Sequence, residues 1–121
     1  NRLQLKDSTL TECFNIENLD LINCKIEGEL SNCILHNCKV RSSSLSNCKF
    51  ISNNDLKYCN LNECKFETNS HNKISNSYIN SLPDAIIYAN LNECIVNSGI
   101  IAYSAEVDNK TEILTNNKIK K

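Results

Sequence analysis

The feature that most constrains the fold is a three-residue step, a small residue, any residue and a large apolar residue, that recurs about every five residues. It reads Cys-Lys-Val at 38–40, Cys-Lys-Phe at 48–50 and Cys-Asn-Leu at 59–61, and Ser or Ala takes the small position elsewhere. A period of five fits neither the helical period of about 3.6 nor the strand period of about 2. The step therefore predicts short extended pieces that are separated by tight turns.

Residues two apart in an extended piece face the same side, so the small and the large residue of each step point inward together. Stacked pieces would then pair as parallel strands roughly 4.8 Å apart. The pattern predicts an all-β parallel solenoid whose interior is lined by these two positions. The predicted core consists of the large residues Ile26, Leu35, Val40, Leu45, Phe50, Leu56, Leu61, Phe66, Leu91 and Val96 and of the small residues Cys24, Cys33, Cys38, Cys48, Cys59, Cys64 and Cys94.

The turns must be made without the usual turn residues, because the chain has two Gly and one Pro but 21 Asn. Asn tolerates left-handed backbone angles and can bond its own backbone. The composition therefore predicts that Asn turns the chain at many corners.

Two units, Cys-Asn-Leu-Asn-Glu at 59–63 and Ala-Asn-Leu-Asn-Glu at 89–93, have the pattern of one protein family. The chain resembles the pentapeptide-repeat family over residues 3–66 and 84–102. The resemblance implies a right-handed quadrilateral β-helix of about five coils, with about twenty residues in each coil. Residues that far apart would share a side, which would place Cys38 under Cys59 and Lys25 with Lys65.

The pattern divides the chain into two parts. Residues 1–102 are predicted to form the repeat helix, with an irregular interruption at about 67–83, and residues 103–121 a C-terminal cap or docking tail. Within the interruption Ile74 and Ile79 stand off the five-residue register, which indicates either a shift of register or a loop. Asn1 stands where an initiator Met would, which favours a processed or excised segment of a larger protein.

The eight Cys are predicted to be buried free thiols that act as small apolar residues. Disulfides require a specific separation and dihedral angle that a stack of parallel neighbours does not offer. A zinc site at Cys33, His36 and Cys38 is disfavoured, because zinc ligand pairs normally repeat and His36 is predicted at an outward turn. We therefore expect no metal and no cofactor, and a reducing compartment or a virion rather than disulfide-dependent secretion.

Catalysis is not predicted. His71 is interpreted as a polar residue that marks the interruption, and the acidic pairs Glu27 with Glu29 and Glu63 with Glu67 are assigned to solvated outer faces. A nucleophile needs a neighbouring base and a glycosidase needs paired carboxylates of unequal pKa, and the pattern brings neither together.

Charge excludes several partners. With 13 basic and 14 acidic residues the net charge is −1, which is far from the basic surface that nucleic acid requires. Lys25, Lys39, Lys49 and Lys65 precede large residues and are predicted to be spread around the shaft. The apolar runs are too short to span a membrane, and neither a nucleic acid nor a small molecule is expected as a partner.

The favoured function is a non-catalytic structural or protein-interaction module, as part of a larger assembly such as a virion, in the capsid decoration or the tail. A protein partner or a second copy is expected at a coil end or at the tail 103–121, because open strand edges need covering. Two alternatives stay open. One is a topoisomerase-binding DNA mimic, an activity that the family resemblance brings in, and the other is a trimeric β-helical segment of a viral fibre.

Overall fold

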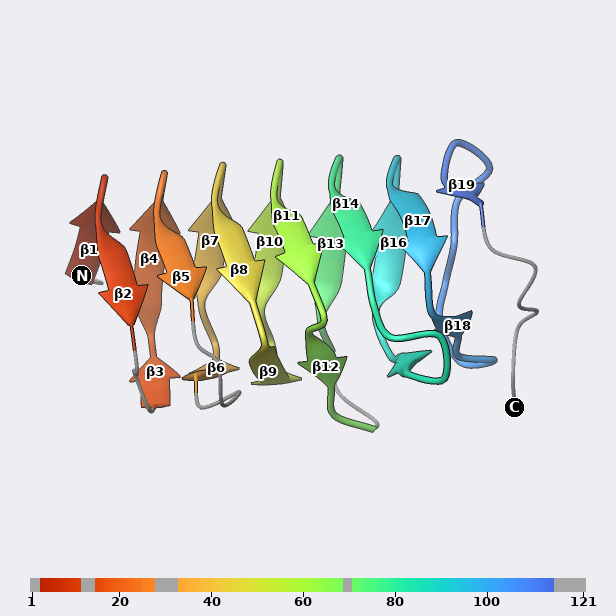
Figure 1. Ribbon diagram of the computed structural model, residues 1–121, viewed down its shortest axis with the longest axis horizontal. Helices are drawn as coiled ribbons and strands as arrows, with labels where there is room; N and C mark the ends of the chain where they lie inside the picture. Colours follow the sequence, from red (N-terminus) through yellow and green to blue (C-terminus); the bar gives the residue numbers. More distant parts are fainter. Residues whose placement is uncertain (1–2, 12–14, 28–32, 69–70, 115–121) are drawn as a thin grey trace.

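The computed structural model describes residues 3–11, 15–27, 33–68 and 71–114. This part of the chain is an all-β parallel solenoid, and every strand pairing in it is parallel. The strands are two to five residues long and stack along one axis from the N-terminal to the C-terminal end (Figure 1). The first sheet contains one strand from each of six coils, so the solenoid is close to the five coils predicted.

Three sides form the solenoid. Sheet A contains β1 (Leu3–Lys6), β4 (Leu19–Ile22), β7 (Lys39–Arg41), β10 (Asp55–Lys57), β13 (Lys73–Ser75) and β16 (Asn90–Asn92). Sheet B contains β2 (Thr9–Thr11), β5 (Lys25–Glu27), β8 (Ser44–Ser46), β11 (Asn60–Asn62), β14 (Tyr78–Asn80), β17 (Ile95–Ser98) and β19 (Glu112–Ile113). The third side consists of sheet C, with β3 (Asn15–Glu17), β6 (Cys33–His36), β9 (Cys48–Ser52) and β12 (Lys65–Phe66), and of the pair β15 (Ile86–Ile87) and β18 (Ile100–Ile101).

The prediction of a four-sided coil is therefore wrong. Register partners in sheet A, such as Leu5, Leu21 and Val40, lie between 16 and 19 residues apart instead of about twenty. Cys38 precedes a strand of sheet A and Cys59 precedes a strand of sheet B, so the two do not stack on one side. The five-residue step fixes the length of one side with its corner, but it does not fix how many sides close a coil.

The interior is filled by the large residue of each step. The described large residues of the predicted core are all buried, and so are Ile16, Leu21, Ile74, Ile79, Ile87 and Ile101. The rings of Phe50 and Phe66 stack with centroids 5.2 Å apart. Six of the predicted core cysteines are buried beside them, and the side chain of Cys33 lies outside the described residues.

Polar side chains replace the thiol at some inward small positions, and they bond along the solenoid axis. Asn54 Oδ1 accepts a hydrogen bond from the Cys38 amide at 2.9 Å, and Asn72 Oδ1 accepts one from the Asn54 amide at 3.1 Å. Asn54 Nδ2 donates to the Leu35 carbonyl at 3.0 Å. Among the described residues no buried side-chain nitrogen or oxygen lacks a partner, so the interior tolerates these amides.

Corner residues adopt the left-handed conformation. Eleven described residues other than Gly have a positive φ, and six of them are Asn, namely Asn18, Asn23, Asn37, Asn47, Asn53 and Asn76. Some corner amides also bond to the coil before: Asn37 Nδ2 donates to Asn18 Oδ1 at 2.6 Å. Asn thus performs the turning role that its abundance predicted, and the ladders add hydrogen bonds between coils.

The range 67–83 contains two regular strands. In β13 and β14, Ile74 and Ile79 occupy the inward centres and pair in register with Leu56 and Leu61. A shifted register therefore carries the solenoid through this range, and the irregular part follows β14, where the chain turns at Pro83. Among the described residues there is no helix that is long and apolar enough to cross a membrane.

The range 103–114 begins a further coil. Val107 forms a bridge with Leu91 of sheet A, and β19 pairs with β17 of sheet B. The remainder of the predicted tail, residues 115–121, lies outside the described residues.

Candidate interaction surfaces

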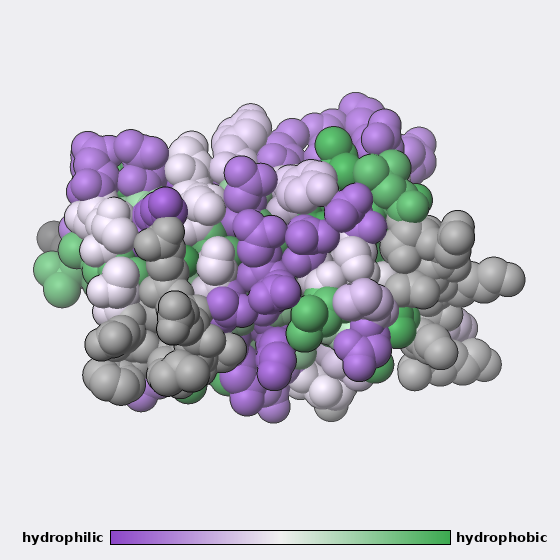
Figure 2. Space-filling model, in the orientation of Figure 1, coloured by the Kyte–Doolittle hydropathy of each residue, from purple (hydrophilic) through white to green (hydrophobic). Residues whose placement is uncertain are grey.

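The first candidate surface is the C-terminal end of sheet B. The sheet ends at β19, and no strand of the described residues covers its outer edge. Ile113 is 38% exposed and Leu114 is 60% exposed, and Tyr103 of the same partial coil is 61% exposed. Figure 2 shows hydrophobic surface gathered over β17 and β19 beside a largely hydrophilic middle of the face. We call Tyr103, Ile113 and Leu114 the end patch.

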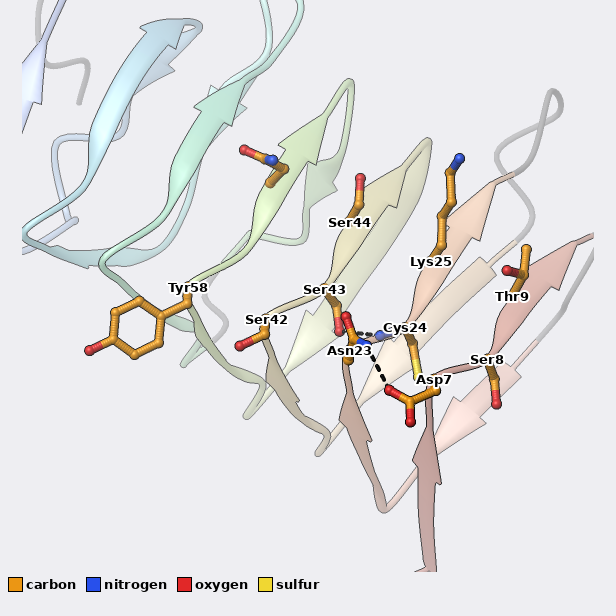
Figure 3. Close-up of a pocket in the computed structure, with 11 residues that line it drawn as sticks. Asp7, Ser8, Thr9, Asn23, Cys24, Lys25, Ser42, Ser43, Ser44 and Tyr58 are labelled. Atoms are coloured by element: carbon orange, nitrogen blue, oxygen red, sulfur yellow. Dashed lines mark hydrogen bonds between the residues drawn. The ribbon is translucent and has the colours of Figure 1, made fainter.

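The second candidate surface is a shallow groove along the corner between sheets A and B. The step from one sheet to the other is five residues in each of the six coils, from Leu5 and Leu10 to Leu91 and Val96. Corner residues therefore fall into straight rows, which Figure 3 shows in the N-terminal half of the groove. Its lining there is Asp7, Ser8, Thr9, Asn23, Cys24, Lys25, Ser42, Ser43, Ser44, Tyr58 and Asn60.

The floor of this corner groove is held by hydroxyl groups. Ser43 Oγ accepts a hydrogen bond from the Cys24 amide at 3.0 Å (Figure 3). It donates one to the Arg41 carbonyl at 2.8 Å. Ser77 repeats the arrangement with the Cys59 amide at 3.0 Å. Ser and Cys therefore alternate along this column, and each buried hydroxyl bonds to its own coil and to the coil before.

The outward face of sheet A carries charges of alternating sign. Asp20, Lys39, Asp55 and Lys73 are register neighbours in successive strands. Arg41 Nη2 lies 3.2 Å from the Asp55 carboxylate. Opposite charges on neighbouring strands stabilise a sheet modestly, and their sum leaves no strong field of either sign.

The lysines lie on three sides, but not as predicted. Lys25 lies on sheet B and Lys65 on sheet C, so the two do not share a side. Lys49 and Lys65 are instead register neighbours on sheet C, and Lys39 lies on sheet A. The ion pair of Lys49 with Glu67, at 3.3 Å, offsets the repulsion on sheet C.

The described cysteines are free thiols inside the solenoid. Burial raises the pKa of the thiols of Cys59 and Cys94. A hydrogen bond with Cys64, together with burial, raises the pKa of the Cys48 thiol strongly. The same hydrogen bond lowers the pKa of the Cys64 thiol, which is buried. The thiolate is the reactive form, and the raised pKa of Cys48, Cys59 and Cys94 disfavours it.

His36 is placed differently from the prediction. It is the last residue of β6 and half-buried, rather than a solvated turn residue, and its Nδ1 lies 2.9 Å from Ser52 Oγ. Glu17 is its register neighbour but makes no hydrogen bond to the imidazole. Within the described ranges the pair therefore has no orienting carboxylate of a triad, and it lies on the outer face of sheet C.

The other predicted polar residues are also separated. His71 is exposed before β13, Glu63 stands at a left-handed corner, and Glu67 pairs with Lys49. The side chain of Glu27 and all of Glu29 lie outside the described residues. Within the described ranges no three His, Cys, Asp or Glu side chains are placed to hold one metal ion.

These features define a class, the parallel β-solenoid proteins whose outer faces are polar and near-neutral. Comparisons with protein-family models, with curated proteins and with solved structures found no match. The fold and its surfaces are therefore the basis for a functional proposal.

Proposed function

We propose that this chain is a non-catalytic structural or protein-interaction module that joins its partner through the C-terminal end of the solenoid. The observation that carries the proposal is the end patch. It combines exposed apolar side chains with an edge of β19 that no strand of the described residues covers, and β17 and then β14 continue the sheet inward. An open strand edge offers unpaired backbone groups to another chain, and adjacent apolar side chains add burial on contact.

The kind of partner that fits is another β-edge with an apolar border. A second copy of the chain or a neighbouring protein of an assembly could supply it, as a capsid decoration or a tail part of a virion would require. The rigid stack of coils suits a spacer, since each coil contacts its neighbours and transmits position along the axis.

The resemblance to the pentapeptide-repeat family is proposed with three units in each coil instead of four. The units at 59–63 and 89–93 place Leu61 and Leu91 inward and Glu63 and Glu93 at left-handed corners. We propose a divergent pentapeptide-repeat chain in which three units rather than four close a coil.

The test compares the association of the 121-residue chain with that of Leu114→Glu by sedimentation equilibrium over a wide concentration range. The matched control is Leu82→Glu, because Leu82 is also an exposed leucine, at 41%, but lies after β14. We expect Leu114→Glu to weaken association by about tenfold or more and Leu82→Glu to leave it unchanged. The same three proteins serve as bait against candidate assembly proteins.

Equal association of all three proteins, or no association with itself or with any assembly protein, would overturn the proposal. The DNA-mimic alternative is less well supported, because charges of opposite sign alternate on sheet A. The trimeric-fibre alternative predicts a stable trimer in the same sedimentation experiment.

A further inference from the structure

The C-terminal half of the corner groove carries two exposed aromatic rings on neighbouring coils. Tyr58 stands at the corner before β11 and is 59% exposed, and Tyr78 begins β14 and is 38% exposed. Asn60 begins β11, two residues after Tyr58, and is the register partner of Tyr78. An exposed carboxamide therefore neighbours both aromatic residues, Tyr58 along its own coil and Tyr78 across the strand pair.

The hydrogen-bonding capacity of this cluster is unused. Among the described residues, neither the Asn60 carboxamide nor the hydroxyls of Tyr58 and Tyr78 have a hydrogen-bond partner in the protein. The corner amide Asn76, by contrast, donates to Glu93 Oε2 at 2.8 Å. The cluster thus offers donors, acceptors and two ring faces to a ligand without the loss of an internal bond.

The surroundings of the cluster favour an uncharged ligand. This half of the groove is lined by Tyr58, Cys59, Asn60, Asn76, Ser77, Tyr78, Glu93 and Ile95. Glu93, the one carboxylate in this lining, is paired with Lys110 at 3.2 Å. Lys57 Nζ lies 5.5 Å from the Tyr58 ring centroid and holds the ring in a cation–π contact.

An extended peptide has no edge to pair with in this groove. The backbone of β11 is paired with β8 on one side and with β14 on the other, so strand addition is blocked. Sugar rings need no backbone partner. Their C–H faces pack on the negative faces of aromatic rings, and their hydroxyls accept from and donate to carboxamides.

We propose that Tyr58, Asn60 and Tyr78 form a binding site for a neutral oligosaccharide that lies along the corner between sheets A and B. The two rings hold the faces of neighbouring sugar units, and the Asn60 carboxamide bonds hydroxyls between them. Ser42 and Ser44 extend the polar lining of the same groove toward the N-terminal end. This surface is separate from the end patch, so the inference does not rest on the proposed function.

The experiment uses the full 121-residue chain and a panel of neutral hexasaccharides: cellohexaose, chitohexaose, maltohexaose, xylohexaose and mannohexaose. Binding is measured by isothermal titration calorimetry and by tyrosine fluorescence, since the chain has four Tyr and no Trp. At least one hexasaccharide is expected to bind.

Each ring is removed by a substitution that its backbone accepts. Tyr58→Asn suits φ 58°, because Asn holds six of the eleven left-handed corners, and Tyr78→Thr places at this outward position the residue found at Thr9 in the first coil. Each variant should weaken binding by about tenfold, with an unchanged melting temperature. The control Tyr103→Asn removes a ring that is equally exposed, at 61%, but lies in the end patch, and its affinity should match that of the parent.

Three results would overturn the inference. One is no binding to any hexasaccharide at millimolar concentration. Another is binding that survives Tyr58→Asn together with Tyr78→Thr. The third is binding of a proline decamer in place of the sugars, which would reassign the rings to a peptide. Loss of sugar binding leaves association through the end patch intact, so the two proposals fail separately.

Discussion

Asn54 offers the sharpest test of how the solenoid interior is held together. Its side chain is 1% exposed and replaces the thiol found one coil earlier at Cys38. It accepts a hydrogen bond from the Cys38 amide and donates one to the Leu35 carbonyl. The substitution Asn54→Ala removes both bonds, together with the 3.0 Å bond from Asn54 Nδ2 to Asn72 Oδ1, and takes the Asn54 partner away from one buried N–H and one buried C=O.

The expected cost follows from these two groups. A buried polar group that loses its hydrogen bond costs about 1–3 kcal/mol, so Asn54→Ala should lower the free energy of unfolding by about 2–6 kcal/mol. Asn60→Ala is the matched control, because Asn60 is an exposed strand residue whose side chain has no protein partner among the described residues. It should change stability by no more than about 0.5 kcal/mol.

Urea unfolding followed by circular dichroism measures the difference. With a slope of about 2 kcal/mol per molar urea, a loss of about 3 kcal/mol moves the midpoint by roughly 1.5 M. Hydrogen exchange gives a local readout, since the Cys38 amide should lose protection before amides of distant coils. If Asn54→Ala shifts the midpoint no more than Asn60→Ala, the buried amide column does not stabilise the fold and the reasoning is refuted.

Three further perturbations follow from burial and geometry. Leu61→Asp should unfold the chain by circular dichroism, because an unpaired buried charge costs several kcal/mol, whereas Lys49→Glu breaks a half-exposed ion pair and should cost under about 1 kcal/mol. If Leu61→Asp and Lys49→Glu melt at the same temperature, the inward position of Leu61 is wrong. Gly99→Ala should lower stability by about 1–3 kcal/mol in urea, because Gly99 has φ 121° and an added Cβ would lie 2.9 Å from Ile87 Cδ1; an unchanged midpoint would contradict this. Burial raises the pKa of the Cys59 thiol, so the stability contributed by the neutral thiol is complete below its ordinary pKa of 9.0 and is lost as pH rises above that value. Cys59→Ser should therefore flatten the alkaline decline in the melting temperature. An unaltered decline would count against a buried thiol with a raised pKa at this position.

Much of the fold follows from the spacing of residues along the chain. The step from small to large residue predicts the inward positions, because a three-residue strand puts both on one face whatever follows it. Leu45 and Phe50 illustrate this, since each is buried at the centre of its strand. The abundance of Asn likewise predicts the left-handed corners.

The number of sides could not be predicted in the same way. A coil closes in three dimensions, and its closure depends on the corners with extra residues, such as the one between Ile79 and Ile87, rather than on the repeat itself. The family resemblance supplied a four-sided coil, and this was wrong. Ile74 and Ile79 lay off the expected register for the same reason, because Ile74 follows Phe66 by eight residues instead of five.

The candidate surfaces were predicted only in part. The tail from Tyr103 was expected to dock, and the end patch lies there, but its role stays a prediction. The corner groove was missed, because the five-residue step identifies the inward positions and says nothing of exposed ones such as Tyr58 and Tyr78. A signal was available in Tyr58, a large aromatic residue at a corner position that Asn usually fills.

The constant step between sheets A and B has a consequence for how such a chain can change. Insertions at the other two corners lengthen a loop and leave the six coils aligned along the corner between sheets A and B. An insertion at this corner would move one coil out of alignment. It would also interrupt the stacks of side chains on sheets A and B. The corner between sheets A and B therefore keeps the coils in register, and the other two corners can accept inserted sequence without disturbing it.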